Sequence, residues 1–255
     1  MSATTIITGA GTGIGRAIAF RLASEGHKLA LMARNTERLE DTAQEARTLG
    51  APSVSIHGCD IKEKAQVDEA FAAAHAVLGN FTGLVANSGI GGPNSDGTDD
   101  RFVELVQTNL TGTYFCLRAA QRHMAPGPDP RNLIAVASIL GRFGVPGYTG
   151  YCASKTGIMG LVRALAHEVA GDNIQVNALC PGWVSTDMAW EGIDGMAQGM
   201  GVSRDEAHKI AMSQVPMGRM SQPEDIAGVV AWLMSGDARG VTGQGIDING
   251  GAWMG

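Results

Sequence analysis

The sequence is poor in aromatic residues and in lysine: Phe, Trp and Tyr make up 5% of it, with three tyrosines and five lysines. No run of 18 apolar residues occurs, so we expect no membrane-spanning helix. The net charge of −6 offers no basic field for nucleic acid or for an anionic membrane. The six histidines are isolated, and no H-x-x-x-H pair or Cys/His cluster is present, so we expect no metal site.

Cysteine is also scarce, and its four copies form no C-x-x-C pair. Four free, mostly buried thiols in a reducing compartment are the simplest interpretation. The N-terminus, MSATTIITGAG, has no basic region and enters a strand pattern at once, which is unlike a signal peptide. We therefore expect a cytoplasmic protein.

What the chain does contain is a regular alternation of two patterns. At 255 residues and 44% hydrophobic content it can form one large α/β domain, and no linker or repeat divides residues 1–255. Strands that are apolar on both faces, each followed by a helix pattern, predict a parallel sheet covered on both sides. We predict strands at 4–8, 28–33, 53–58, 83–87, 132–138, 174–179 and 245–248. Helices are predicted at 14–25, 36–48, 63–78, 99–124, 151–170 and 223–234. The result is a single Rossmann-like, doubly wound domain with a seven-stranded parallel sheet.

The segment between Pro181 and Pro223 interrupts this alternation. It contains no strand pattern but holds six of the twelve methionines and two of the four tryptophans. Long insertions of this kind are typical of binding loops, and methionine suits an adaptable apolar surface. We expect a mobile substrate lid around 183–222; ordinary packing of a short helical subdomain is the alternative.

A glycine-rich turn follows the first predicted strand directly. It reads T-G-A-G-T-G-I-G over residues 8–15, and a helix pattern begins there. Glycines let a backbone approach a pyrophosphate, and a helix N-terminus offers free N–H groups. The G-x-G-x-x-G spacing of dinucleotide-binding turns is absent, however, so a tight strand-to-helix connection remains the alternative.

Tyr151 and Lys155 stand four residues apart in Y-C-A-S-K and so share one face of a predicted helix. A cation ~5 Å from a phenolate stabilises it by about 3 kcal/mol at an effective dielectric of ~20, or roughly two pKa units. The pair therefore predicts a tyrosine that can donate and accept a proton near neutral pH. Chance placement on a helix surface is the alternative.

These motifs, taken in order, resemble the short-chain dehydrogenase/reductase family over essentially the whole chain. The matching pieces are T-G-x-x-x-G-x-G, Asp60 in CDI, Asn87-Ser88-Gly89, Asn109 in TNLTG, Ser138, Tyr151-x-x-x-Lys155 and Pro181-Gly182. The resemblance implies a catalytic tetrad of Asn109, Ser138, Tyr151 and Lys155. Ser138 would hydrogen-bond the carbonyl oxygen, and Asn109 would hold a water that relays protons to the lysine; a plain strand-end or helix hydrogen bond is the alternative for each.

The resemblance also implies a set of residues that bind a nicotinamide dinucleotide. They are Gly9, Thr12, Gly13, Ile14 and Gly15 in the glycine turn, Arg34, Asp60 and Ile61 at the adenine end, Asn87 and Gly89, Tyr151 and Lys155, and Pro181, Gly182, Val184 and Thr186 around the nicotinamide amide. The acid that would bind the ribose hydroxyls of NAD is replaced by Ala33, and Arg34 follows it. Because a guanidinium pairs with a 2′-phosphate, we predict NADP(H). NAD(H) stays the alternative, with Arg34 then a solvated surface arginine.

The function that these expectations support is a reversible NADP(H)-dependent carbonyl reductase. The C-terminal half is most similar to 3-oxoacyl and polyketide ketoreductases and related alcohol dehydrogenases, and the apolar lid favours a hydrophobic ketone. An NAD-dependent alcohol, polyol or hydroxysteroid dehydrogenase is one alternative. A non-catalytic nucleotide-binding regulator is another, although it would not need Tyr151 and Lys155. The resemblance further implies a homotetramer, with the helices carrying Asn109 and Tyr151 and the C-terminal GIDINGGAWMG in its interfaces.

Overall fold

Short apolar runs form the seven strands of one sheet in the computed structural model, which describes residues 3–125 and 127–255. The strands are β1 Thr4–Thr8, β2 Lys28–Ala33, β3 Val54–Gly58, β4 Gly83–Ala86, β5 Arg131–Val136, β6 Ile174–Pro181 and β7 Gly245–Ile248. Every pair of neighbours is parallel, and their order is β3-β2-β1-β4-β5-β6-β7. The order reverses between β1 and β4, and ligands of such sheets bind beyond the carboxyl ends of the strands at this point.

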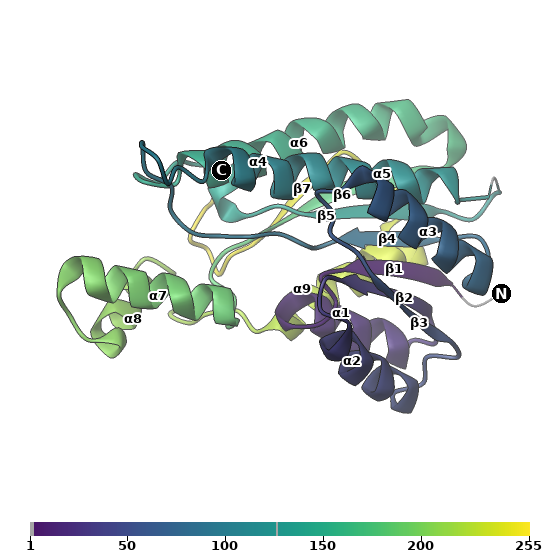
Figure 1. Ribbon diagram of the computed structural model, residues 1–255, viewed down its shortest axis with the longest axis horizontal. Coiled ribbons are helices and arrows are strands. Elements are labelled where there is room, and N and C mark those ends of the chain that lie inside the picture. The colour runs from purple at the N-terminus through teal and green to yellow at the C-terminus, as the bar shows by residue number, and fades with distance from the viewer. Residues whose placement is uncertain (1–2, 126) are drawn as a thin grey trace.

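Helices cover both faces of the sheet (Figure 1). On one face lie α3 Lys64–Leu78, α4 Phe102–Val106, α5 Thr113–Arg122 and α6 Thr149–Val169; on the other lie α1 Gly13–Ser24, α2 Thr36–Thr48 and α9 Pro223–Met234. The single doubly wound sheet predicted from the sequence is therefore confirmed. Among the described residues, no helix is both long and apolar enough to span a membrane.

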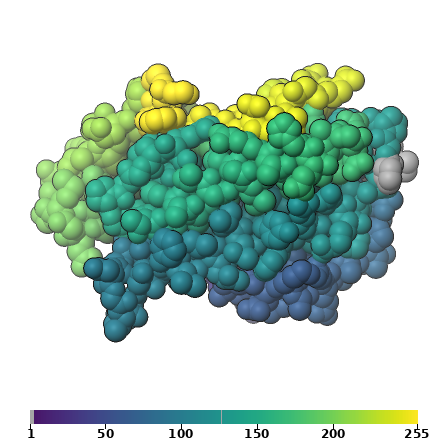
Figure 2. All heavy atoms as spheres, turned by 90° about the horizontal axis from the view of Figure 1, so that it is seen from above, coloured from purple at the N-terminus to yellow at the C-terminus, as the bar shows by residue number. Residues whose placement is uncertain are grey.

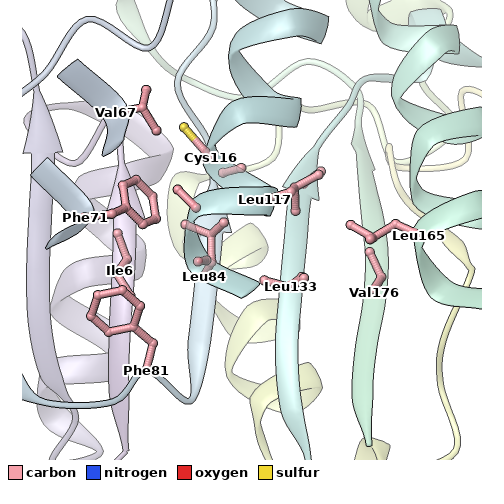
Figure 3. Close-up of a cluster of buried hydrophobic side chains, with 14 of the residues drawn as sticks. Ile6, Val67, Phe71, Phe81, Leu84, Cys116, Leu117, Leu133, Leu165 and Val176 are labelled. Carbon is pink, nitrogen blue, oxygen red and sulfur yellow. The ribbon is translucent and has the colours of Figure 1, made fainter. Parts of the chain in front are cut away.

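Two cores lie on either side of the sheet, because the strands are apolar on both faces. Figure 3 shows the core beneath α3, α5 and α6, where Phe71 of α3 faces Ile6 of β1 and Leu117 of α5 lies beside Leu84 and Leu133 of the sheet. The second core joins the sheet to α1, α2 and α9. The four cysteines are free thiols, three of them buried, as expected.

The helix predicted over 99–124 is not one regular helix. It divides into α4, a π-helical turn η1 (Gln107–Gly112) and α5. In this turn the Thr113 hydroxyl donates to the Asn109 carbonyl at 2.7 Å, a side-chain bond that competes with the regular ladder. π-helical turns cluster at functional sites, and this one carries Asn109.

The segment between β6 and α9 folds into two further helices, α7 Asp187–Met200 and α8 Arg204–Ser213, which the sequence analysis did not place. They share a small core of their own that includes Ile193, Ala207 and Met212. Both helices project from one end of the sheet (Figure 1), and in Figure 2 this part, in light green, lies at one end of the molecule beside the C-terminal residues in yellow. The methionines of this segment include both core residues and exposed residues: Met212 is buried, whereas Met188 is 46% exposed.

Candidate active site

Ser138 stands just beyond the carboxyl end of β5, where the chain leaves the sheet. Its hydroxyl accepts a hydrogen bond from the Leu140 N–H at 3.1 Å and so caps the short 3₁₀ turn η2 (Ile139–Gly141). Only 8% of the residue is exposed. Since a hydroxyl has one donor and two acceptor positions, this bond fixes the oxygen and leaves its proton available. The β5 strand ends at Val136, two residues earlier than predicted.

Tyr151 and Lys155 lie in the first two turns of α6, and helical spacing brings them together as predicted. The Lys155 Nζ is 5.6 Å from the centre of the Tyr151 ring and donates to the Val136 carbonyl at 2.9 Å. Lys155 is 4% exposed and has no carboxylate partner among the described residues. A buried ammonium without a counter-charge costs free energy, so its presence here needs another purpose.

Burial dominates the acid–base properties of this pair. Burial raises the pKa of the Tyr151 phenol above its ordinary value, and the neighbouring Ser138 hydroxyl lowers that pKa by a smaller amount. Burial also lowers the pKa of Lys155, to about 8. We expected Lys155 to lower the pKa of Tyr151; in the protein alone the net direction is upward, because desolvation of the phenolate by burial is the largest cause. The phenol is a proton donor at neutral pH, and Lys155 is still mostly protonated there.

Asn109 is fully buried, and its amide links three segments. Its Oδ1 accepts from the Ile90 N–H at 2.9 Å, and its Nδ2 donates to the Ile90 carbonyl at 3.0 Å and to the Ser154 hydroxyl at 3.1 Å. A Cβ placed on Gly89 would lie 3.1 Å from the Asn109 Oδ1 and 3.5 Å from the Lys155 Nζ. Asn109 thus lies where three segments meet: the loop after β4, the π-helical turn and α6.

The glycine turn packs against the end of β4. Gly9 and Gly13 have φ values of +67° and +51°, which favour glycine. A Cβ on Gly15 would lie only 2.2 Å from the Gly9 carbonyl oxygen, so α1 crosses the turn too closely for any side chain. Asn87 holds the turn from β4 by donating to the Thr8 and Gly9 carbonyls at 3.0 and 3.3 Å.

Helix α1 begins without a capping side chain at Thr12. The N–H groups of Gly13, Ile14 and Gly15 have no acceptor among the described residues. Unpaired N–H groups at a helix N-terminus carry positive partial charge and are suited to bind a phosphate group. The residues of the turn therefore fit the pyrophosphate of a dinucleotide.

The residues predicted to bind the adenine end of the cofactor differ in their exposure and in their contacts. Arg34 is exposed at the end of β2 and forms no ion pair among the described residues, so its guanidinium is available for an anion. The Asp60 carboxylate accepts from the Lys62 N–H at 3.0 Å and lies 3.7 Å from the Lys62 Nζ. Ile61 is 5% exposed and packs on Gly112 of the π-helical turn. Its side chain serves the core, which the sequence could not indicate.

The residues predicted around the nicotinamide follow β6. Pro181 ends that strand, and the Gly182 N–H donates to the Ile248 carbonyl at 3.0 Å. Val184 is buried, and Thr186 caps α7 by accepting from the Ala189 N–H at 3.4 Å. A Cβ on Gly13 would lie 3.1 Å from the Thr186 Cγ2. The start of α7 therefore lies against the glycine turn, so the segments expected to hold the pyrophosphate and the nicotinamide amide are in contact.

Two further segments border the catalytic residues. A Cβ on Gly91 would lie 3.0 Å from the Met188 Sδ, so the loop after β4 touches the first turn of α7. On the other side, Arg142 forms a bidentate bond to Asp247 at 2.9 and 3.1 Å, which ties the turn after Ser138 to β7. The described residues contain no cluster of three or more His, Cys, Asp or Glu that could hold a metal ion.

Known proteins are similar to this chain in sequence and in fold. The model of a family described as enoyl-(acyl carrier protein) reductase matches residues 9–252. The 3-oxoacyl-[acyl-carrier-protein] reductase FabG of Staphylococcus aureus is 34% identical over 260 residues, covering 100% of this chain and 99% of that protein. The chain belongs to the short-chain dehydrogenase/reductase family. It is an oxidoreductase of that family.

Other members of the short-chain dehydrogenase/reductase family are similar along their whole length. A putative ketoacyl reductase of the granaticin polyketide synthase from Streptomyces violaceoruber is 36% identical over 249 residues, 96% of this chain and 91% of that one. The crystal structure of a variant of actinorhodin polyketide ketoreductase with NADPH superposes with a TM-score of 0.91 at 33% identity, covering 98% of this chain and 97% of that one. The predicted family resemblance is thereby confirmed.

The four residues predicted as the catalytic tetrad lie together in the structure, whereas the predicted cofactor residues divide. The glycine turn lies against Thr186 after β6, and Arg34 is exposed at the end of β2, while the side chains of Asn87 and Ile61 are engaged within the protein. The sequence analysis missed Ser154, which accepts from Asn109, and Asn94, which binds the start of α6. Ser154 lies inside the quoted Y-C-A-S-K, but nothing in the sequence names its partner 45 positions away.

Proposed function

We propose that this short-chain dehydrogenase/reductase is an NADP(H)-dependent carbonyl reductase that acts on a ketone and, in reverse, on a secondary alcohol. The observation that carries the proposal is the adjacency of the Tyr151 phenol and the Ser138 hydroxyl at the carboxyl edge of the sheet, with the Lys155 ammonium buried behind them. Reduction of a carbonyl requires a proton donor at its oxygen, and these groups provide one.

The protein's part in the reaction is to bind, to orient and to move a proton. A bound nicotinamide cofactor supplies the hydride. Ser138 donates a hydrogen bond to the carbonyl oxygen as negative charge develops there, and such contacts contribute on the order of 10²–10³ in rate. Tyr151 transfers its phenolic proton to that oxygen, and the charged Lys155 stabilises the phenolate that remains.

The lost proton must return to Tyr151 before the next turnover. Asn109 and Ser154 form a buried hydrogen-bonded pair beside Lys155, and Gly89, which has no side chain, lets the loop after β4 approach both Asn109 and Lys155 closely. In the proposed mechanism Asn109 holds a water in this region and Lys155 relays its proton. Since the phenol has a raised pKa, the protein favours the protonated form that reduction uses.

The choice of NADP(H) rests on the phosphate end. Arg34 is exposed and unpaired among the described residues, and Ala33 stands where a carboxylate would repel a 2′-phosphate. The similar actinorhodin polyketide ketoreductase forms a crystal structure with NADPH, which supports this choice. Gly9 to Gly15 would hold the pyrophosphate, and Asp60 and Ile61 would border the adenine. Asn87 and Gly89 would lie beside the middle of the cofactor. Pro181 to Thr186 would surround the nicotinamide amide.

The substrate we expect is a hydrophobic ketone, in free form or as a 3-oxoacyl group. Met188 and Trp183 of the segment between β6 and α9 lie against Gly91 and Gly192, and this apolar segment would act as the lid around 183–222. The similar proteins are named as 3-oxoacyl and ketoacyl reductases. We keep the homotetramer and the cytoplasmic location as predictions of the same proposal.

A panel of substrates decides the proposal. We expect turnover of hydrophobic ketones and 3-oxoacyl thioesters, with kcat/KM higher for NADPH than for NADH. Because the matching family model is described as an enoyl reductase, the panel includes 2-enoyl thioesters of the same chain length. Preferred reduction of the enoyl compounds, or a clear preference for NADH, would contradict the proposal.

A further inference from the structure

The helix that carries Tyr151 and Lys155 has no capping group of its own. Helix α6 begins after Tyr148, whose side chain forms no cap hydrogen bond. The first N–H groups of a helix need acceptors from outside it, and an uncapped first turn frays. Tyr151 lies in this first turn, so the position of its phenol depends on how the turn is held.

The missing cap comes from a distant loop. The Asn94 Oδ1 accepts from the Gly150 N–H at 2.8 Å and lies 3.2 Å from the Thr149 hydroxyl oxygen, although Asn94 is 55 to 56 positions earlier in the chain. The Asn94 N–H also donates to the Gly147 carbonyl at 2.8 Å. An amide oxygen at this place satisfies the same donors as an N-cap side chain.

The other half of the Asn94 amide is engaged as well. Its Nδ2 donates to the Asp100 Oδ1 at 3.1 Å and to the Thr149 hydroxyl oxygen at 3.0 Å. The same Asp100 oxygen accepts from the Phe102 N–H at 2.9 Å, at the start of α4. The Gly150 N–H can only donate and the Asp100 carboxylate can only accept, so these two partners fix the orientation of the amide. A Cβ on Gly150 would lie 3.0 Å from the Phe102 Cα, which shows how closely the two helix starts approach.

The same loop borders the substrate side of the site. It begins at Ile90, which Asn109 binds through both backbone groups, and continues to Gly91, which touches Met188. The connection runs from the loop through Asn94 to the first turn that carries Tyr151.

We propose that Asn94 is a positioning residue, whose side chain caps the catalytic helix from the substrate-side loop and holds the Tyr151 phenol beside Ser138. The proposal rests on the proposed carbonyl reduction only for its kinetic consequence. Its structural consequence, an ordered Tyr151 ring, holds in the protein without any substrate.

Three variants test this role. Asn94→Ala removes both halves of the link. The double variant Asn94→Asp with Asp100→Asn exchanges the two groups, keeping an acceptor for Gly150, a donor between positions 94 and 100 and the same net charge. Ser95→Ala is the matched control, since Ser95 is exposed in the same loop and its side chain forms no hydrogen bond within the described residues.

We expect Asn94→Ala to lower kcat about tenfold, with the KM for NADPH changed by less than about twofold, because misplaced catalytic groups slow the chemical step. The exchanged variant should recover kcat to within about threefold, and Ser95→Ala should match the unmodified protein. A wild-type kcat for Asn94→Ala, a loss confined to cofactor KM, or an exchanged variant as slow as Asn94→Ala would each overturn the proposal.

An NMR measurement separates this proposal from the proposed function. With ¹³Cζ-labelled tyrosine the protein gives three tyrosine signals, and Tyr151→Phe identifies the one that belongs to Tyr151. We expect Asn94→Ala to shift or broaden that signal in the substrate-free protein, and the exchanged variant to restore it. If the unmodified protein reduces no ketone, the proposed function fails, yet an unchanged Tyr151 signal in Asn94→Ala would still be needed to overturn the role of Asn94.

Discussion

The two ends of the proposed site are built in different ways. At the chemical end Ser138, Lys155 and Asn109 are buried side chains, each with hydrogen-bond partners inside the protein. At the phosphate end the functional groups are backbone N–H groups of α1 and the exposed guanidinium of Arg34, which have no partners among the described residues. The chemical end is thus set in place before any ligand arrives, whereas the phosphate end offers free donors to a charged group that brings its own acceptors.

This difference separates the effects of substitution. Changes at Ser138 or at the hydroxyl group of Tyr151 should alter the rate and leave cofactor affinity nearly constant. Changes at the phosphate end should alter cofactor affinity or the choice between NADPH and NADH. A substitution at one end that changes the quantity expected only for the other end would show that the two ends are not independent.

The largest expected effect is at Tyr151. Tyr151→Phe removes the proton donor but keeps the ring, and general acid catalysis contributes on the order of 10²–10⁴ in rate. We expect kcat to fall on the order of 10³, with the dissociation constant of NADPH changed less than about threefold. Stopped-flow turnover and fluorescence titration of NADPH measure the two quantities. Tyr114→Phe, at an exposed position of α5, is the control and should be fully active; normal turnover of Tyr151→Phe would refute the mechanism.

The sharpest change at the phosphate end is Gly15→Ala. A methyl group there would lie 2.2 Å from the Gly9 carbonyl oxygen, so the turn must shift and its N–H groups move. We expect NADPH to bind about a hundredfold more weakly, since each lost charge-assisted hydrogen bond costs about 1.5–3 kcal/mol. Isothermal titration gives the affinity. Gly160→Ala, at a position with nothing within 4 Å, is the control; equal affinities of both variants would show that the turn does not bind the phosphates.

Arg34→Ala tests whether Arg34 binds the 2′-phosphate of NADPH at the phosphate end of the site. A bidentate guanidinium–phosphate pair predicts a loss of roughly 10- to 100-fold in kcat/KM with NADPH and almost none with NADH. Arg163→Ala, an exposed arginine on α6, should change neither value. Equal losses with both cofactors would place Arg34 outside the 2′-phosphate site.

The sequence predicted the chemical end better than the surfaces around it, for a physical reason. Tyr151 and Lys155 are four positions apart on one helix, so local periodicity alone brings them together. Ser138 was expected from the family resemblance, and it follows a strand of the parallel sheet, whose ligands bind at the carboxyl ends of the strands. The π-helical turn at Asn109 was missed because it depends on Ile90 and Thr113 hydrogen bonds that no local pattern encodes. The cap that Asn94 places on α6 was missed for the same reason.

The helices α7 and α8 were not predicted from the sequence, for a different reason. Their sequence contains four glycines from Gly192 to Gly201, counting both ends, which lower helix propensity. The helices become stable by packing on each other around Ile193 and Met212. The low pKa of Lys155 could not be predicted from the sequence either, because residue spacing indicates its distance from Tyr151 but not the depth of its burial.

The last effect we predict concerns pH, and it tests the chemical end without a substitution. Burial lowers the pKa of Lys155 to about 8, so the ammonium is present below that pH and is lost as pH rises through it. The raised pKa of Tyr151 keeps the phenol protonated over the same range. We therefore expect kcat/KM for ketone reduction to be level up to about pH 7.5 and to fall about tenfold for each further unit above about 8. Lys155→Arg keeps its charge at these pH values and should show no such fall, whatever its absolute rate. A rate that stays level to about pH 9.5 in the unmodified protein would mean that the positive charge of Lys155 is not what stabilises the Tyr151 phenolate.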